Sequence, residues 1–288
     1  MTFLKKYFVV YPSSGLADML SVIERCLQYA VAHERLLIID TSQKVVNSWF
    51  TEDMGDFFHI DHPNVYSQNN QNNKNNDYPS STKSILESLQ SLSIFPDAMI
   101  LVPVKRFYYV LDLTKEYSED VVVHSSGGFS GIPEFLLSCM HITPMVSKIY
   151  HQRRSLLPEK YTSVHIRNTD KKSDVPSFLE KHHRVLSEQV IFLASDHYDT
   201  IQHIKQQKVL YPHVHTFSNI PNNQGNNIHS DMPLANCRES IVDCIVDLLL
   251  LASAESFLYP HLKSGYTRIV KYLFDNKSIL HQILTIRE

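Results

Sequence analysis

The fold is decided by residues 7–40, which read YFVVYPSSGLADMLSVIERCLQYAVAHERLLIID. Residues 7–11 form a short apolar run that ends in the turn PSSG. Apolar residues then recur at helical spacing from Leu16 to Val31, and a second apolar run occupies residues 36–39. A strand, a helix and a second strand in succession predict a βαβ unit, and therefore a parallel sheet.

The second half of the chain repeats this alternation. The apolar runs predict strands at residues 161–167, 190–194, 214–217 and 257–259. Helical patterns cover residues 177–187, 199–207, 236–254 and 264–274. We therefore expect an α/β fold with two Rossmann-like, doubly wound parallel-sheet domains that face a cleft. The basic, proline-containing stretch 151–160 suggests domains at residues 1–155 and 156–288.

Three segments interrupt the regular pattern. Residues 67–84 include SQNNQNNKNND and offer no apolar face, which predicts a mobile surface loop. That loop is either an inert insertion or a flap that binds an acceptor. Residues 125–131, SSGGFSG, hold three of the seven glycines and predict a turn or a close approach to a ligand. Residues 138–150 predict a helix that Pro144 breaks.

Composition excludes several classes of protein. A formal charge of −3 over 288 residues argues against a nucleic-acid partner. The four cysteines form no CxxC pair and indicate reduced thiols in the cytoplasm. The first apolar run is too short for a signal peptide, and Asp243 and Asp247 interrupt the longest later one. We expect a cytoplasmic protein that touches a membrane only peripherally, if at all.

Motifs for cofactors and metals are missing. The sequence has no GxGxxG and no GxxxxGK[ST], which disfavours a NAD-dependent enzyme and excludes a P-loop kinase. The sixteen histidines do not form a ligand set at a familiar spacing. We therefore expect neither a cofactor nor a metal.

Polar side chains follow the predicted strands of the second half at their carboxyl ends, where open α/β sheets bind ligands. They are His165, Arg167, Asp170, Asp196 and Ser264, and Gly265 follows the last of them. The guanidinium of Arg167 is a planar fork of donors suited to phosphate. Ser264 and the N–H groups that begin the last predicted helix add neutral donors and a favourable dipole. Together they predict a diphosphate site.

Asp247 lies on the predicted helix at residues 236–254 and can accept two N–H bonds from one base edge. Guanine presents such a pair of donors, so a carboxylate here favours a guanine nucleotide. Each feature also has a plainer interpretation. Arg167 could pair with Asp170 at the surface. Asp243 and Asp247 could lie on the solvent-exposed face of a helix, and Ser264 could be an ordinary helix cap.

The same segments resemble the fucosyltransferases of the α1,6, α1,2 and protein-O-fucosyl groups. Residues 161–174, YTSVHIRNTDKKSD, resemble the first motif block of that superfamily. Residues 190–201, VIFLASDHYDTI, and residues 240–273, SIVDCIVDLLLLASAESFLYPHLKSGYTRIVKYL, resemble its second and third blocks. Residues 13–40 resemble its opening glycine loop, helix and strand, which makes Gly15 a candidate donor contact.

The resemblance implies a GT-B-type fold, an inverting mechanism without a metal, and GDP-fucose as the donor. The acceptor would be a glycan or glycolipid. The resemblance also implies roles for six residues. Arg167 would contact the β-phosphate and Ser264 the phosphates, with His165 and Asp247 near the guanine. Asp170 would support the arginine or the fucose. Asp174 lies one residue from the position of the general base in the α1,6 group, and Asp170 is the other candidate base.

Asn168 stands where the α1,6 pattern has a second arginine. This departure leaves two alternatives open. One is a GT-B transferase that uses another nucleotide sugar. The other is a non-catalytic nucleotide- or glycan-binding relative.

Overall fold

The computed structural model describes residues 6–41, 52–66, 94–95, 110–126, 128, 131–222 and 237–286. The chain separates into two compact units, Met1–Thr143 and Pro144–Glu288. Helix α4 (Pro144–Arg154), which the sequence analysis assigned to the first domain, therefore groups with the second unit. The Tyr150 hydroxyl, on α4, lies 2.8 Å from Ser253 Oγ of the same unit. The predicted loop at residues 67–84 lies outside the described residues.

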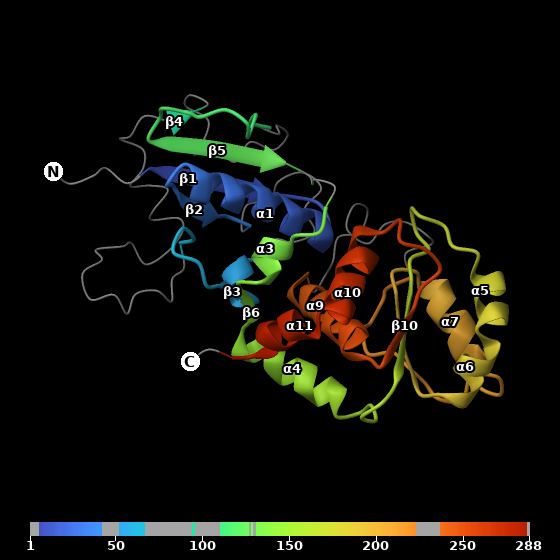
Figure 1. The fold of residues 1–288 in the computed structure, drawn as a ribbon. Coiled ribbons are helices and arrows are strands. Elements are labelled where there is room, and N and C mark those ends of the chain that lie inside the picture. The colour runs from blue at the N-terminus through green and yellow to red at the C-terminus, as the bar shows by residue number, and fades with distance from the viewer. Residues whose placement is uncertain are drawn as a thin grey trace. The chain divides into compact units, whose positions relative to one another are not determined.

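The first unit is built on a parallel sheet (Figure 1). The chain runs through β1 (Tyr7–Pro12), α1 (Leu16–Ala32) and β2 (Leu36–Ile39), as the sequence predicts. Strands β5 (Val121–Ser126) and β4 (Ile94–Phe95) extend the sheet in the order β2-β1-β5-β4, with every pair parallel.

The alternation of side chains along β1 gives the sheet of the first unit two buried faces. The ring of Phe8 packs edge-on against Tyr29 of α1, with centroids 5.0 Å apart. Val9 and Tyr11 point the other way and pack with Val121 and Val123 of β5. A strand that is buried on both faces reads as a continuous apolar run, which explains why this strand is recognisable in the sequence.

A smaller antiparallel pair completes the first unit. Strand β3 (Phe58–Ile60) follows the 3-10 helix η1 (Met54–Asp56) and pairs with β6 (Met140–Ile142), which α3 (Glu134–Leu137) precedes. The helix predicted at residues 138–150 is therefore wrong over its first part, which is a strand. Pro144 begins helix α4 instead of breaking one, because the first helical position needs no N–H donor.

The second unit holds a second parallel sheet. Its strands are β7 (Thr162–Ile166), β8 (Ile191–Ser195), β9 (Val214–His215) and β10 (Ser256–Leu258), in the order β10-β7-β8-β9. The helices that follow α4 are α5 (Val175–Lys181), α6 (His183–Glu188), α7 (Tyr198–Gln206), α9 (Cys237–Ser253), α10 (Gly265–Asp275) and α11 (Lys277–Leu284). One predicted helix, at residues 177–187, is thus two helices, and α11 was not predicted.

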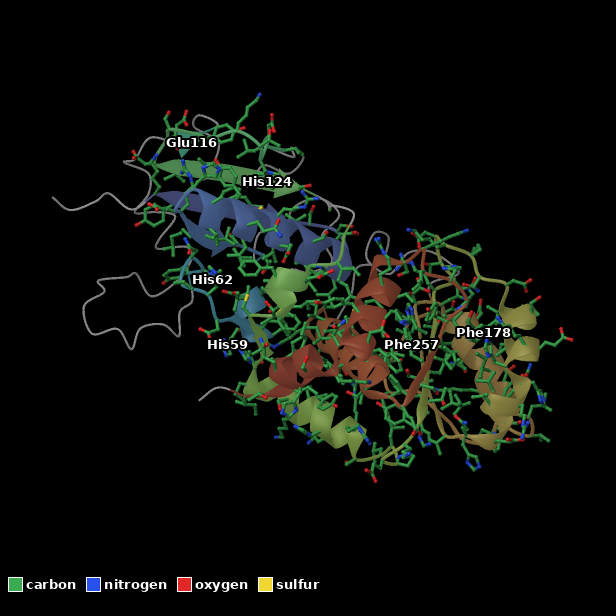
Figure 2. All side chains as sticks on the ribbon, viewed as in Figure 1. His59, His62, Glu116, His124, Phe178 and Phe257 are labelled. Carbon is green, nitrogen blue, oxygen red and sulfur yellow. The ribbon has the colours of Figure 1, made fainter. Side chains whose placement is uncertain are left out.

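Helices cover both faces of this second sheet (Figure 1). Val164 and Ile166 of β7 pack with Phe178 and Leu179 of α5, and Phe178 is labelled in Figure 2. The alternate residues of the same strand face α9, where Ser163 Oγ donates to the Leu251 carbonyl at 2.8 Å. This alternation also turns His165 toward α10. The predicted α/β class, with two parallel-sheet units, is confirmed.

Arg35 is a buried cation that joins separate parts of the first unit. Its side chain is almost fully enclosed, with 1% of the residue exposed. Its guanidinium donates to the carbonyl of Tyr7 at 3.2 Å, to that of Glu119 at 3.0 Å and to that of Tyr117. These carbonyls lie at the start of β1 and just before β5, so Arg35 ties together the ends of two neighbouring strands.

Replacement of Arg35 by Ala is expected to destabilise the protein by about 2–4 kcal/mol, because three partly buried carbonyls lose a donor and the buried arginine leaves a cavity. The midpoint of urea unfolding of the full chain measures this loss. Arg184→Ala, at an exposed arginine paired only with Glu188, is the matched control and should shift the midpoint little. Equal midpoints for the two variants would contradict a structural role for Arg35.

Candidate functional site

Asp196 organises the carboxyl edge of the second sheet. It directly follows β8, and its carboxylate accepts from the Asn168 backbone N–H at 2.8 Å and from the Thr169 hydroxyl at 2.5 Å. The Arg167 Nε lies 3.6 Å from the same carboxylate. These contacts hold the segment that follows β7, residues 167–174, against the end of the neighbouring strand. We call this segment the β7 loop.

The Arg167 guanidinium is held on one side by two carboxylates. Its Nη2 lies 2.7 Å and its Nε 2.9 Å from Asp170 Oδ1, and only 19% of the arginine side chain is exposed. The pairing of Arg167 with Asp170 that the sequence allowed is therefore present. Partial burial would raise the pKa of Asp170, but the adjacent guanidinium and hydrogen bonds outweigh it and hold that pKa below its ordinary value. The carboxyl group of Asp170 is therefore charged at neutral pH.

The β7 loop touches the segment between β10 and α10, residues 259–264, which we call the β10 loop. Lys171 Nζ donates to the carbonyl of Lys263 at 2.9 Å. Ser173 Oγ lies 3.2 Å from Nε2 of His261. These two contacts bring Arg167 and the start of α10 to the same edge of the sheet, as the sequence predicted. Ser173 and His261 were not among the predicted site residues.

The start of α10 is a capped, partly buried helix end. Ser264 is its N-cap, and its buried hydroxyl accepts from the Thr267 N–H at 3.4 Å. Gly265 is the first helical residue. Ser264 is thus an ordinary cap, as the plainer interpretation held. The cap uses the oxygen of Ser264 as an acceptor, and the structure gives no acceptor for its hydroxyl hydrogen within the described residues.

His165 is buried beside α10. Its Nδ1 lies 2.8 Å from the Thr267 hydroxyl, and its ring centroid lies 5.0 Å from that of Tyr266. Burial, with smaller effects from Arg167 and His261, lowers the pKa of His165 to about 4, although Asp196 opposes the shift. His165 is therefore neutral at pH 7 and can act as a hydrogen-bonding side chain without adding a charge.

Asp247 and Asp243 lie next to this region, on α9. The Tyr266 hydroxyl donates to the carbonyl of Cys244, between them, at 2.8 Å. Both aspartates are 7% exposed, so the interpretation that they form a solvent-exposed face of the helix is wrong. Asp243 pairs with Arg153 and accepts from the backbone N–H of Asn219 at 3.2 Å.

The two oxygens of Asp247 differ in their contacts with the described residues. Oδ2 accepts from the Ser218 hydroxyl at 2.6 Å. Oδ1 is buried and accepts no hydrogen bond from that part of the chain, and Arg153 Nη1, which lies 4.0 Å from it, donates none. Burial raises the pKa of Asp247 to about 7, although Ser218 and Arg153 oppose the shift. The unsatisfied oxygen is an acceptor available to a ligand donor.

Asp174 caps a helix. It precedes α5 and accepts from the backbone N–H of Ser177 at 3.1 Å and from the Ser177 hydroxyl at 2.8 Å. Its side chain is exposed, and the two hydrogen bonds lower its pKa. A role as general base stays a prediction for Asp174, and its local contacts are those of a helix N-cap.

Gly15 belongs to the first unit, where it precedes α1. Its φ is −75°, and a Cβ placed on it would meet nothing within 4 Å, so the described structure sets no steric demand for glycine there. The glycine cluster differs. Gly128 has a φ of +135°, and a Cβ would lie 2.7 Å from Cβ of Asp18, so this position requires glycine. Close packing on α1 thus accounts for this glycine.

Within the described residues, no three His, Cys, Asp or Glu side chains are grouped so that they could hold a metal ion. No helix in the same part of the chain is long and apolar enough to cross a membrane.

The raised pKa of Asp247 predicts a pH-dependent effect on stability. Its pKa of about 7 in the folded chain exceeds the ordinary value of 3.8, so the folded chain binds this proton more tightly. The contribution of Asp247 to the free energy of unfolding is therefore fully present below about pH 4, and it is lost as the pH rises through about 7. Because Asn stays neutral, the melting temperature of Asp247→Asn minus that of the parent chain should rise between these pH values. The exposed control Asp199→Asn should give a constant difference; a constant difference for Asp247→Asn would contradict the assignment.

The similarity of this chain to known proteins is seen in its structure. No protein-family model and no curated protein matches the chain. A solved structure of NodZ α-1,6-fucosyltransferase co-crystallized with GDP is 15% identical, with 93% of each chain covered and a TM-score of 0.59. Fucosyltransferase NodZ from Bradyrhizobium is 16% identical over 93% of this chain and 94% of the other, with a TM-score of 0.56. POFUT1 in complex with GDP is 12% identical over 96% of each chain, with a TM-score of 0.56. The chain therefore has the fold of the fucosyltransferases, the group that its sequence motifs resemble.

Proposed function

We propose that this chain is an inverting glycosyltransferase that transfers fucose from GDP-fucose to a hydroxyl of a glycan or glycolipid, without a metal. One observation carries the proposal: Arg167 and the N-terminus of α10 share the carboxyl edge of one parallel sheet, joined by contacts between the β7 and β10 loops. The fold around this edge is shared with NodZ, which has been soaked with GDP-fucose and co-crystallized with GDP.

The donor diphosphate is proposed to lie between Arg167 and the start of α10. Negative charge grows on the leaving diphosphate as the bond to the sugar breaks. A fixed guanidinium, the Ser264 hydroxyl and the backbone N–H groups of the first helical turn, which starts at Gly265, would stabilise that charge. Asp170 and Asp196 hold the guanidinium in place before the donor arrives. Because these groups supply positive potential, we expect the reaction to proceed in the presence of a chelator.

The nucleobase is proposed to bind near Asp247 and His165. The buried Oδ1 of Asp247 has no hydrogen-bond partner among the described residues, and the guanine edge offers two adjacent N–H donors. Neutral His165 would contribute a hydrogen bond or a packing surface. Gly15 of the first unit stays a proposed donor contact, on the strength of the sequence resemblance.

The acceptor hydroxyl must lose a proton, and we propose Asp170 as the group that takes it, ahead of Asp174. Asp174 already uses both oxygens on Ser177, whereas the contacts of Asp170 fall on Oδ1. A lowered pKa makes either carboxylate a weak base. Transfer rates of Asp170→Asn and Asp174→Asn, compared at saturating donor, separate the two assignments.

Asn168 supports one competing function, a non-catalytic nucleotide-binding protein, because a second arginine is missing from the phosphate site. Steady release of fucose or GDP from GDP-fucose would exclude it.

Replacement of Arg167 by Ala is expected to lower kcat/KM for GDP-fucose by ~100-fold, the usual effect of removing a fixed charge contact to a transition state. Arg184→Ala is the matched control, since Arg184 also pairs with a nearby acidic residue but is exposed and is not a predicted site residue. A radiolabelled or mass-spectrometric transfer assay measures both. Near-normal transfer by Arg167→Ala would remove it from the site.

Among GDP, UDP, ADP and CMP, GDP is expected to raise the melting temperature most, because Asp247 can bind both donors of guanine. Asp247→Asn should reduce that preference by about 1–3 kcal/mol of binding free energy, the range for one hydrogen bond to a charged group. Thermal shift and calorimetric titration measure it. A preference for another nucleotide would instead favour a transferase with a different donor.

A further inference from the structure

Ser173 connects three parts of the site at once. Its backbone N–H donates to Asn168 Oδ1 at 3.1 Å, within the β7 loop. Its hydroxyl donates to the carbonyl of Arg167 at 2.6 Å. The same hydroxyl oxygen lies 3.2 Å from His261 Nε2, in the β10 loop. Ser173 thus holds the main chain of Arg167 directly and also binds the side chain of the next residue, Asn168.

The direction of the last hydrogen bond follows from proton counting. A serine hydroxyl has one hydrogen, and a carbonyl oxygen can only accept. Since Ser173 gives its hydrogen to Arg167, the Nε2–H of His261 must donate to the Ser173 oxygen. Of the two neutral tautomers of His261, this contact therefore selects the one with its hydrogen on Nε2. Among the described residues, Nδ1 is buried without a hydrogen-bond partner, so the contact with Ser173 orients the ring.

Asn168 is suited to this arrangement in a way that arginine is not. Its Oδ1 accepts from Ser173, and its Nδ2 donates to Thr200 Oγ1 of α7 at 3.1 Å. An arginine side chain has donors but no acceptor, so it could not bind the Ser173 N–H. The residue that departs from the motif therefore has a defined structural role in this chain.

We propose that Asn168, Ser173 and His261 form a clamp that positions Arg167. The clamp acts through the main chain of Arg167 and holds the guanidinium where the donor diphosphate is proposed to bind. His261 is thus a positioning residue. This inference rests on the proposed function. Loss of the clamp would leave Arg167 charged but mobile, so part of the binding free energy would be spent on ordering the β7 loop.

Variants at His261 test the clamp in the full chain. His261→Ala removes the donor to Ser173 and is expected to raise the Kd for GDP ~10-fold, since small misplacements of a binding group cost one to two orders of magnitude. His261→Gln offers an amide N–H close to the position of Nε2 and should bring the Kd back to within about threefold of the parent value. His281→Ala, at an exposed histidine of α11, is the control.

Three results would overturn the clamp. One is an unchanged Kd for GDP in His261→Ala. Another is a His261→Gln variant as impaired as His261→Ala, with kcat rather than Kd affected, which would make the ring an acid–base group. The third is a fall in the melting temperature of His261→Ala large enough to account for its weaker binding of GDP. That result would make the residue a general stabiliser of the fold.

A measurement without nucleotide keeps the clamp testable if the chain does not bind GDP. In the full chain with ¹⁵N-labelled histidine, the nuclear magnetic resonance signals of His261 should report a hydrogen on Nε2. Ser173→Ala should shift the Nε2 signal of His261, because the hydrogen bond to Ser173 is lost, and leave the signals of His281 unchanged. A hydrogen on Nδ1 in the parent chain would refute the clamp. Absence of GDP binding together with the Nε2–H form would refute only the proposed function.

Discussion

The carboxylate of Asp196 is the contact on which the candidate site depends. It ends one strand, yet it accepts hydrogen bonds from the loop that ends the neighbouring strand. A parallel sheet brings strand ends together, but it does not shape the loops that leave them. Here a single anion gathers a backbone N–H, a hydroxyl and a guanidinium, and so converts a sheet edge into a surface of defined geometry. The other contacts of the β7 loop build on that arrangement.

Charge in the second unit is distributed by burial. The most exposed part of the site keeps its ions, because Arg167 and Asp170 stabilise one another. In the more buried part of the unit, His165 is neutral at pH 7. The pKa of Asp247 is raised to about 7 there, although Arg153 lies nearby. A diphosphate and a purine base make these opposite demands, since one needs fixed positive charge and the other needs hydrogen-bond acceptors in a dry setting. The more exposed, charged part of the site thus suits the diphosphate of the proposed nucleotide, and the more buried part suits its base.

Sequence reasoning recovered the features that depend on local periodicity. The βαβ unit at residues 7–40 and the strands of the second sheet were predictable because doubly buried strands are continuous apolar runs. The prediction failed where a strand depends on pairing with a segment distant in the sequence. The three residues of β6 are an example, because they form a strand by pairing with β3. In the site, Arg167 and Ser264 were found because they follow predicted strands. Ser173, His261 and Arg153 were missed because their roles come from contacts between loops and helices distant in the sequence.

The buried guanidinium of Arg35 has a consequence for how the chain acquires its structure during synthesis. Two of its three carbonyl partners, at residues 117 and 119, are made more than eighty positions after the arginine itself. Until they emerge from the ribosome, the Tyr7 carbonyl is the one acceptor of the Arg35 guanidinium, among the described residues, that has been made. The first half of the chain therefore cannot mature from its amino end alone, and nascent fragments that stop short of β5 should be substrates for chaperones.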